Sequence, residues 1–331
     1  MSTLTATRAR ERRLHPLAAF VLRRLAVGVL LVFLVSLLVF GATQILPGDA
    51  ASAILGRSAT AEQKEIYRQE LGLDRPLPAQ YWSWMSGVVQ GDLGRSLASR
   101  EPVTSFISER IGKTLVLALA TLLILVPLSL ALGVWAGIRR NRPADHVISS
   151  VSLGLIALPE FVTGTLLVAF IAISLKLLPP TSILESGQSP LTSPKLIVLP
   201  VLTLCLTAAA YIIRMIRAGV VETMTSDYVE MARLNGVPER RVVVRHALRN
   251  ALAPTVQVLA LTVQYLIGGI VIVETVFAYP GLGHGLVQAV VARDIPVVQG
   301  VAMLLAALYI VINILADVVV VLLIPKLRTS Q

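Results

Sequence analysis

The 331-residue chain has few charged residues, few aromatic residues and a single cysteine. Charged residues make up 15% of the sequence, whereas an ordinary soluble domain carries about a quarter. Cys205 has no partner for an internal disulfide, and the four histidines are scattered without the spacing of metal ligands. The net charge is +10, but the basic residues lie between apolar runs and aromatic residues are only 5%. These features argue against a nucleic-acid partner.

Motifs for nucleotide binding and catalysis are also missing. Residues 112–114 look like the end of a P-loop, but Ile107 stands where that motif needs glycine. Residues 281–285 resemble a dinucleotide fingerprint, but Leu286 replaces the third glycine, so a turn is expected there. No nucleophile with a base and an orienting group can be identified. We therefore expect a protein that is not an enzyme and binds no metal and no cofactor of its own.

Apolar residues are abundant: 55% of the chain is hydrophobic, and the mean hydropathy is +0.78. Crossing a bilayer takes about twenty apolar residues. Six runs reach that length, at residues 25–45, 114–138, 147–177, 196–216, 255–277 and 297–323. We therefore expect an all-α integral membrane protein with six transmembrane helices. The third run is overlong, and we expect it either to begin as a cytoplasmic helix or to tilt.

The basic residues set the expected orientation. They gather in both terminal tails, in the loop after the second run and in the segment after the fourth. With six spans these regions share one side, which the positive-inside rule makes cytoplasmic. The expected organisation is a cytoplasmic basic tail at 1–22, a first span at 23–45, an extracytoplasmic segment at 46–113 and a five-span core at 114–331. Both termini are then cytoplasmic.

Two features stand out in the predicted extracytoplasmic segment. Thr60 and Gln63 have the spacing of a capping box, which predicts a helix that reaches about Leu71. Further on, Trp82 and Trp84 belong to an aromatic cluster typical of the membrane–water interface. The cluster indicates either an interfacial anchor or a contact surface for a partner outside the membrane.

The segment between the fourth and fifth runs is polar and rich in arginine. Ser226 or Asp227 would cap a helix ending at Gly236, a residue suited to the left-handed position after a helix. Pro238 would begin a second helix that ends near Asn250. We expect two short helices joined by a tight turn, forming a rigid cytoplasmic knob that docks a partner.

Three carboxylates, Glu160, Glu274 and Asp317, fall in or near the apolar runs. A charge inside a bilayer is costly, so such residues bond to a neighbouring helix or face a water-filled cavity. Either an interhelical bond or the lining of a translocation path would explain each of them. Glu160 follows Pro159 within the third run and is the strongest candidate for path lining.

Glu230-Met231-Ala232 followed by Gly236 resembles the E-A-A-x-x-x-G signature of ABC-importer permeases. Met231 departs from the signature, which has alanine there, and His246-Ala-Leu-Arg249 replaces its I-x-L-P ending. That replacement resembles the form found in the dipeptide/oligopeptide permease family. Segments similar to this family recur in order: LRRL at 22–25, LPGD at 46–49, LGLDRP at 71–76, GDLGRS at 91–96, ETVFAYPGLG at 274–283 and RDIPVVQG at 293–300.

This resemblance implies a type I ABC importer permease with a MetI-like fold in the bacterial inner membrane. It implies a second, homologous permease that forms a heterodimer with this chain within the lipid. It also implies two cytoplasmic ATPase subunits that bind ATP and Mg²⁺, and an extracytoplasmic solute-binding protein. The coupling helices at 226–250 would dock the ATPase through Asp227, Tyr228, Glu230, Ala232, Arg233, Gly236, Arg240, Arg241 and His246.

The resemblance implies dipeptides or oligopeptides as substrates, and related permeases are similar to importers of nickel, glutathione and sugars. Two other classes stay open. An ion-coupled secondary transporter would favour inverted repeats, and none is clear here. A membrane scaffold without transport would have no need for an ordered two-helix knob.

Overall fold

The computed structural model describes residues 16–45, 60–70, 74–184, 188–243 and 248–323. Within these residues the regular elements are all helices, and the one isolated β-bridge joins Arg95 to Pro102. The elements are α1 (Pro16–Ile45), α3 (Ala61–Glu70), α4 (Leu77–Val89), α5 (Val103–Ile138), α6 (Pro143–Ile156), α7 (Glu160–Leu167), η1 (Val168–Ser174), η2 (Pro190–Thr192), α8 (Lys195–Met224), α9 (Asp227–Leu234), α10 (Glu239–Arg241), α11 (Leu248–Val276), α12 (Leu282–Ala292) and α13 (Ile295–Leu323). The all-α prediction is confirmed.

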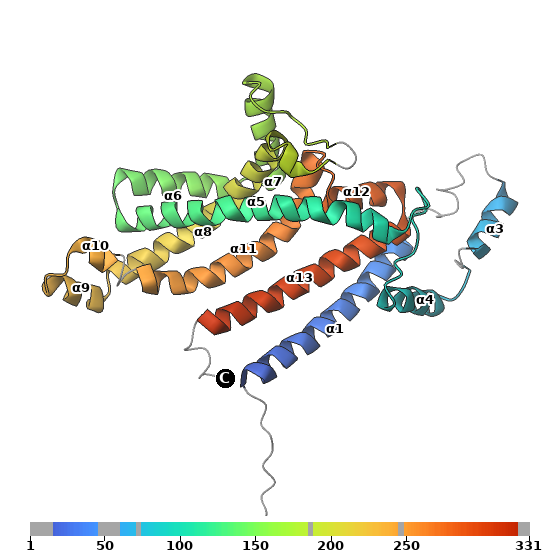
Figure 1. Ribbon diagram of the computed structural model, residues 1–331, viewed down its shortest axis with the longest axis horizontal. Helices are drawn as coiled ribbons and strands as arrows, with labels where there is room; N and C mark the ends of the chain where they lie inside the picture. Colours follow the sequence, from blue (N-terminus) through green and yellow to red (C-terminus); the bar gives the residue numbers. More distant parts are fainter. Residues whose placement is uncertain (1–15, 46–59, 71–73, 185–187, 244–247, 324–331) are drawn as a thin grey trace, which may run out of the picture.

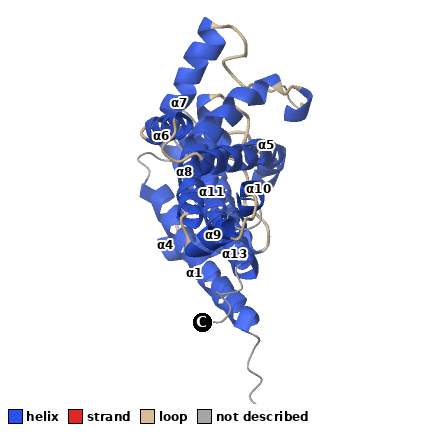
Figure 2. Ribbon diagram, turned by 90° about the vertical axis from the view of Figure 1, so that its left-hand side faces the viewer, coloured by secondary structure: helices blue, strands red, loops and turns tan. Residues whose placement is uncertain are grey.

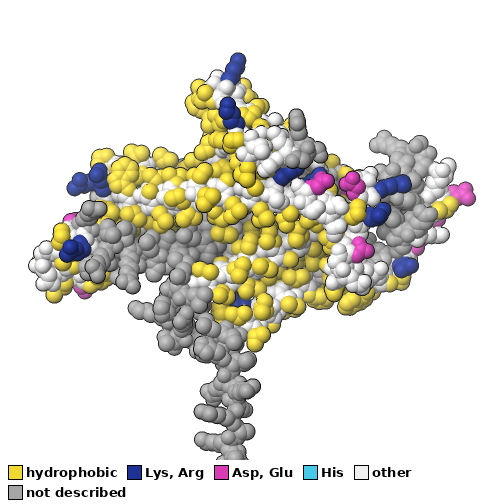
Figure 3. Space-filling view, in the orientation of Figure 1, with side chains coloured by type: hydrophobic (Ala, Val, Ile, Leu, Met, Phe, Trp, Pro, Cys, Tyr) yellow, Lys and Arg dark blue, Asp and Glu magenta, His cyan; other side chains and the backbone are white. Residues whose placement is uncertain are grey.

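The long helices run lengthwise through the molecule, with α8 packed between α5 and α11, and α1 packed on α13 (Figures 1 and 2). The helices α9 and α10 lie at one end, called here the knob end. The helices α4 and α12 lie toward the opposite end, called here the α4 end. Figure 3 shows hydrophobic side chains spread over this face of the helices, while charged side chains gather mainly around the helix ends. Such a surface suits a protein surrounded by lipid.

Four helices are long and apolar enough to cross a membrane: Phe20–Gln44 within α1, α5, α8, and Ile295–Val319 within α13. The helix α6, together with α7 and η1, makes a fifth if the bent pair is counted as one span. The fifth predicted span, residues 255–277, falls on α11, in which the stretch Thr262–Val276 is apolar. The boundary predicted between residues 113 and 114 lies inside α5, which begins ten residues earlier in the chain.

The third apolar run is not one continuous helix. The chain bends by 108° between α6 and the helical stretch Glu160–Ser174. Pro159 has an extended ψ of 149° at this break. Proline has no N–H for the helical ladder, and it disfavours a helical conformation in the residue before it. A tilted continuous helix is therefore excluded, and the first part of the run is a separate helix.

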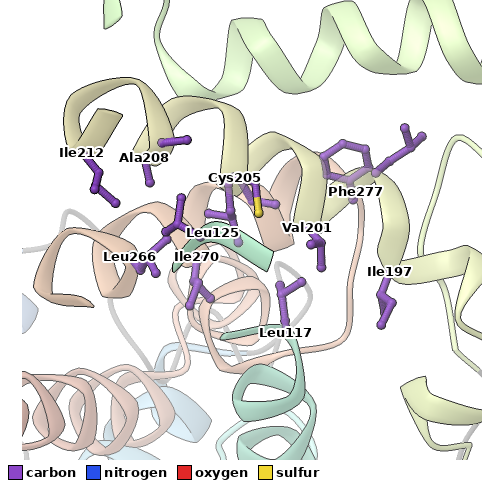
Figure 4. Close-up of a cluster of buried hydrophobic side chains, with 14 of the residues drawn as sticks. Leu117, Leu125, Ile197, Val201, Cys205, Ala208, Ile212, Leu266, Ile270 and Phe277 are labelled. Carbon is purple, nitrogen blue, oxygen red and sulfur yellow. The ribbon is translucent and has the colours of Figure 1, made fainter. Parts of the chain in front are cut away.

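The core surrounds α8. Figure 4 shows side chains of α8 such as Cys205 meeting Leu125 of α5 and Leu266 of α11. Gly133 and Gly137, one turn apart on α5, allow α5 and α8 to approach closely: a Cβ on either would lie 2.7 Å from a side-chain carbon of α8. Small residues four apart let two helix backbones pack tightly in a membrane.

The predicted capping box is confirmed at the start of α3. The Thr60 N–H donates to Gln63 Oε1 at 3.0 Å, and the Gln63 N–H donates to Thr60 Oγ1 at 3.2 Å. The predicted end of this helix, near Leu71, lies outside the described residues. The aromatic cluster of α4 packs on Phe40 of α1, with a centroid separation of 5.9 Å to Trp84. This contact fastens α4 to α1.

Candidate functional site

The knob, residues 226–243, links α8 to α11 and carries most of the predicted docking residues (Figure 1). Val229 of α9 and Val242 after α10 are fully buried and anchor the knob from within. On α9 the charged side chains of Asp227, Glu230 and Arg233 are exposed. The surface predicted to dock a partner is thus accessible, while the opposite side of the knob is packed against the rest of the chain.

The turn after α9 has the predicted glycine geometry. Gly236 has a φ of +73°, in the left-handed region that favours glycine. Its N–H donates to the Arg233 carbonyl at 2.9 Å, and the Val237 N–H donates to the Ala232 carbonyl at 3.1 Å. These two bonds form a Schellman motif, which satisfies carbonyls that the end of a helix leaves free. The prediction of a tight glycine turn is confirmed.

An ion pair that the sequence did not reveal spans the same turn. The guanidinium of Arg233 donates to both carboxylate oxygens of Glu239, at 2.8 and 3.1 Å. This hydrogen-bonded pairing lowers the pKa of Glu239 and raises the pKa of Arg233. Both side chains are substantially exposed, so the pair contributes little stability. It connects α9 to α10 across the turn.

The apolar side chains of α9 also form an exposed stripe. Tyr228, Met231 and Leu234 lie three residues apart along the helix, and 43%, 59% and 75% of their surfaces are exposed. Residues three apart share one face of a helix. The stripe includes Met231, the position at which the chain departs from the general signature.

The second half of the knob differs from the prediction. The helix α10 has only three residues, and α11 runs through Asn250 and Pro254 without a break. The prediction of a helix that ends near Asn250 is therefore wrong. Helices within membrane proteins can continue through proline when surrounding groups bond the backbone carbonyl that proline leaves free. Arg241 is exposed, whereas the side chain of Arg240 and all of His246 lie outside what the structure describes.

A buried ion pair lies near the knob end, between α6 and α8. The guanidinium of Arg217 forms a bidentate pair with Asp145, in which Nη2 lies 2.7 Å from Oδ2. The Asn141 N–H adds a third bond to this carboxylate at 2.9 Å. Asp145 is almost fully buried, so breaking the pair would leave an uncompensated charge. Nothing in the sequence singled out this link between α6 and α8.

Glu274 makes interhelical hydrogen bonds at the α4 end and is not exposed. Its carboxylate accepts bonds from the N–H groups of Gly283 and His284, at 2.7 and 3.1 Å, and from Thr114 Oγ1 at 2.7 Å. Two of these donors lie at the N-terminus of α12, where a negative charge is favoured. A Cβ at Gly281 would collide with the carboxylate. Glu274 therefore ties α11 to α12 and α5, which matches the interhelical alternative.

The two misleading motifs meet at this point. Thr114, the last residue of the apparent P-loop, donates to Glu274 and accepts the Leu282 N–H at 2.9 Å. Leu282 belongs to the apparent dinucleotide fingerprint. Its glycines allow close contact: a Cβ at Gly283 would lie 2.5 Å from the Cα of Val271. The sequence signalled Glu274 and these glycines separately and did not show that they belong to one network.

Asp317 is also in an interhelical contact. Its Oδ2 lies 3.1 Å from Nη1 of Arg24, and both side chains are partly exposed. The pair joins α13 to α1. This again matches the interhelical alternative.

Glu160 is placed differently from the other two carboxylates. It is the first residue of α7, 7% of its surface is exposed, and Pro159 directly precedes it. Its Oε1 is buried and has no hydrogen-bond partner among the described residues. The Tyr265 hydroxyl of α11 lies beside the carboxylate. Glu160 thus keeps the path-lining interpretation open.

Two of the family-like segments contact each other at the α4 end. Asp294 accepts hydrogen bonds from the Leu97 and Ala98 N–H groups, at 3.0 and 3.3 Å, and from the Ser96 hydroxyl. Asp294 is buried. The loop before α5 is therefore held against the chain between α12 and α13.

The chain matches known proteins over nearly its whole length. The family model described as a binding-protein-dependent transport system inner membrane component matches residues 129–329, and the model of its N-terminal part matches residues 17–118. The chain is 39% identical over 309 residues to the glutathione transport system permease protein GsiC of Escherichia coli O6:H1 (strain CFT073), covering 93% of the chain and 98% of that relative. It is 38% identical, with the same coverage, to GsiC of Escherichia coli K12 and of Shigella dysenteriae serotype 1. The chain belongs to the family of inner-membrane permeases of binding-protein-dependent ABC importers.

Proposed function

We propose that the chain is the non-catalytic permease half of an importer for dipeptides or oligopeptides. The geometry of the knob carries the coupling part of this proposal. An anchored α9, a hydrogen-bonded glycine turn and the ion pair between Arg233 and Glu239 make a stiff projection that can transmit force. The stripe of Tyr228, Met231 and Leu234 offers an apolar surface to a partner. Docking of an amphipathic helix into a groove commonly uses such anchors.

The proposed partners follow from this role. Two ATPase subunits would bind ATP and Mg²⁺ and receive the knob on the cytoplasmic side. A second, homologous permease would complete the pore, and a solute-binding protein would deliver the substrate on the opposite side. Both termini would then be cytoplasmic in a bacterial inner membrane. When the ATPase pair closes, the knob would move α8 and α11 and switch the pore between two states.

Peptides and glutathione are the two leading substrate classes. The family resemblance favours peptides, and the names of the relatives favour glutathione. Because glutathione is itself a small peptide, one pore could serve either. Purified transporter with its binding protein, reconstituted in proteoliposomes, would be tested for ATP-dependent uptake of labelled trialanine and glutathione.

The coupling part of the proposal is tested with two knob variants in the same system. Glu230→Lys reverses an exposed charge on α9, and Gly236→Pro is incompatible with the φ of +73°. We expect both complexes to assemble and both to lose most of their uptake. Glu109→Lys is the matched control, because it reverses an exposed charge near the start of α5, at the α4 end. Normal uptake by both knob variants would refute coupling through α9.

A further inference from the structure

A cavity of about 390 Å³ lies between the end of α6, the middle of α8 and α11. Ile156 and Leu158 line it beside the helix break, Tyr211 lines it from α8, and Thr262 and Tyr265 line it from α11. A volume of this size is typical of a small-molecule site. The cavity therefore combines apolar walls with a few hydroxyl groups.

Glu160 lies next to two residues that line this cavity, Leu158 in sequence and Tyr265 in space, and one of its carboxylate oxygens lacks a hydrogen-bond partner among the described residues. It follows the break two residues after Leu158, and its carboxylate lies beside Tyr265, which lines the cavity. The side chain is 93% buried, and its Oε1 accepts no hydrogen bond from the residues that the structure describes. A Cβ at Gly269 would lie 2.6 Å from this oxygen, so glycine at that position gives the carboxylate room. A buried carboxylate oxygen without a partner is costly, which points to a ligand that bonds this oxygen beside Tyr265.

The surroundings of the cavity favour a cation. The C-terminal end of α6 reaches the cavity at Ile156, and helix C-termini carry partial negative charge. Tyr211 and Tyr265 add aromatic faces, which attract ammonium groups. No group of three or more His, Cys, Asp or Glu side chains that could hold a metal occurs among the described residues. An organic ammonium therefore fits better than a chelated metal ion.

We propose that Glu160 and Tyr265 bind the protonated amino group of the transported solute as it passes through the permease. This inference rests on the proposed function and narrows its substrate class. Peptides and glutathione both carry a free amino group, whereas a nickel ion does not. The Glu160 carboxylate would accept hydrogen bonds from the ammonium, and the aromatic ring of Tyr265 would attract the same positive charge.

The first test needs no substitution. Dicyclohexylcarbodiimide, an apolar reagent for carboxyl groups within membranes, would be added to the reconstituted transporter, and modification of Glu160 would be quantified by mass spectrometry. We expect trialanine to reduce this modification several-fold and N-acetyl-trialanine, which lacks the ammonium group, to leave it unchanged. Asp317 is the internal control, because it pairs with Arg24 on another helix interface. Equal modification of Glu160 with and without trialanine would overturn the site.

The second test measures uptake by two variants. Glu160→Gln keeps the size of the side chain and removes its charge, so we expect trialanine uptake to fall about tenfold or more. Glu160→Asp keeps the charge and should recover part of the uptake. Wild-type uptake by Glu160→Gln would refute the amine site and leave the importer function intact. A wild-type complex that imports no solute with ATP would instead refute the proposed function.

Discussion

Replacing Gly236 with alanine should loosen the knob by an amount that its geometry predicts. An added Cβ at this position meets no atom within 4 Å, so alanine introduces no clash with a neighbour. The cost is confined to the backbone, because φ is +73°. An L-residue in the left-handed region costs about 1–2 kcal/mol. This cost lowers the population ratio of the ordered turn to the opened turn by about 5–30-fold.

Hydrogen exchange followed by mass spectrometry measures this ratio directly. The Gly236 and Val237 amides are both bonded within the turn, at 2.9 and 3.1 Å, and exchange only when it opens. In the assembled transporter, Gly236→Ala should speed exchange of the peptide covering the turn by about 5–30-fold. Uptake per ATP hydrolysed should fall with it, because a loosened knob transmits less motion.

Gly236→Asn is the matched control for this experiment. Asparagine adds a larger side chain than alanine but enters the left-handed region far more readily. We therefore expect exchange and uptake close to those of the wild type. If alanine and asparagine perturbed the turn equally, the backbone argument would be wrong, and a steric or contact effect would have to replace it.

Substitutions at three further contacts test the other parts of the structure. Glu239→Arg should loosen the turn by less than about 1 kcal/mol, and the exchange of charges in Arg233→Glu/Glu239→Arg should restore it. Because the pairing lowers the pKa of Glu239, the ion pair should stabilise the turn at neutral pH and lose this effect as the pH falls below 4.5. Hydrogen exchange of the turn at several pH values measures this loss. Glu274→Ala should lower the free energy of unfolding of the purified complex by at least about 2 kcal/mol, because the buried donors lose their acceptor. An unchanged midpoint of thermal unfolding would refute this. Gly137→Leu should cost about 1–3 kcal/mol through overpacking, whereas Gly112→Leu, with open space around it, should be mild.

The features that sequence predicted best depend on local rules. The all-α class, the capping box at Thr60 and the glycine turn at Gly236 follow from composition and spacing within a few residues, and the structure confirms them. The course of α11 through Pro254 was mispredicted, because proline breaks helices in water more strictly than in a packed membrane protein. The bend at Pro159 had a visible cause, but its size depends on how α7 packs against α8 and α11.

The long-range contacts could not be predicted from a single sequence. Thr114 lies 160 residues from Glu274, and Ser96 lies 198 residues from Asp294. No periodicity pairs positions so far apart. The resemblance did mark the segments that contain these acids, but it did not say that they bind other parts of the chain. The roles of the intramembrane carboxylates could also be distinguished only in the structure. Glu274 and Asp317 contact neighbouring helices, whereas Oε1 of Glu160 has no hydrogen-bond partner among the described residues.

The arrangement of α11 relates the knob to the cavity. This helix begins beside the knob, presents Tyr265 and Gly269 at the level of the cavity, and carries Glu274 at the α4 end. Glu274 fixes that far end to α5 and α12, so movement of the knob should tilt α11 about a held end. Glu160 belongs to α7, beyond the break at Pro159, and its carboxylate lies beside Tyr265 and Gly269 of α11. The cavity is therefore bordered by elements that a knob movement would displace unequally, and its amine site should change shape in each transport cycle.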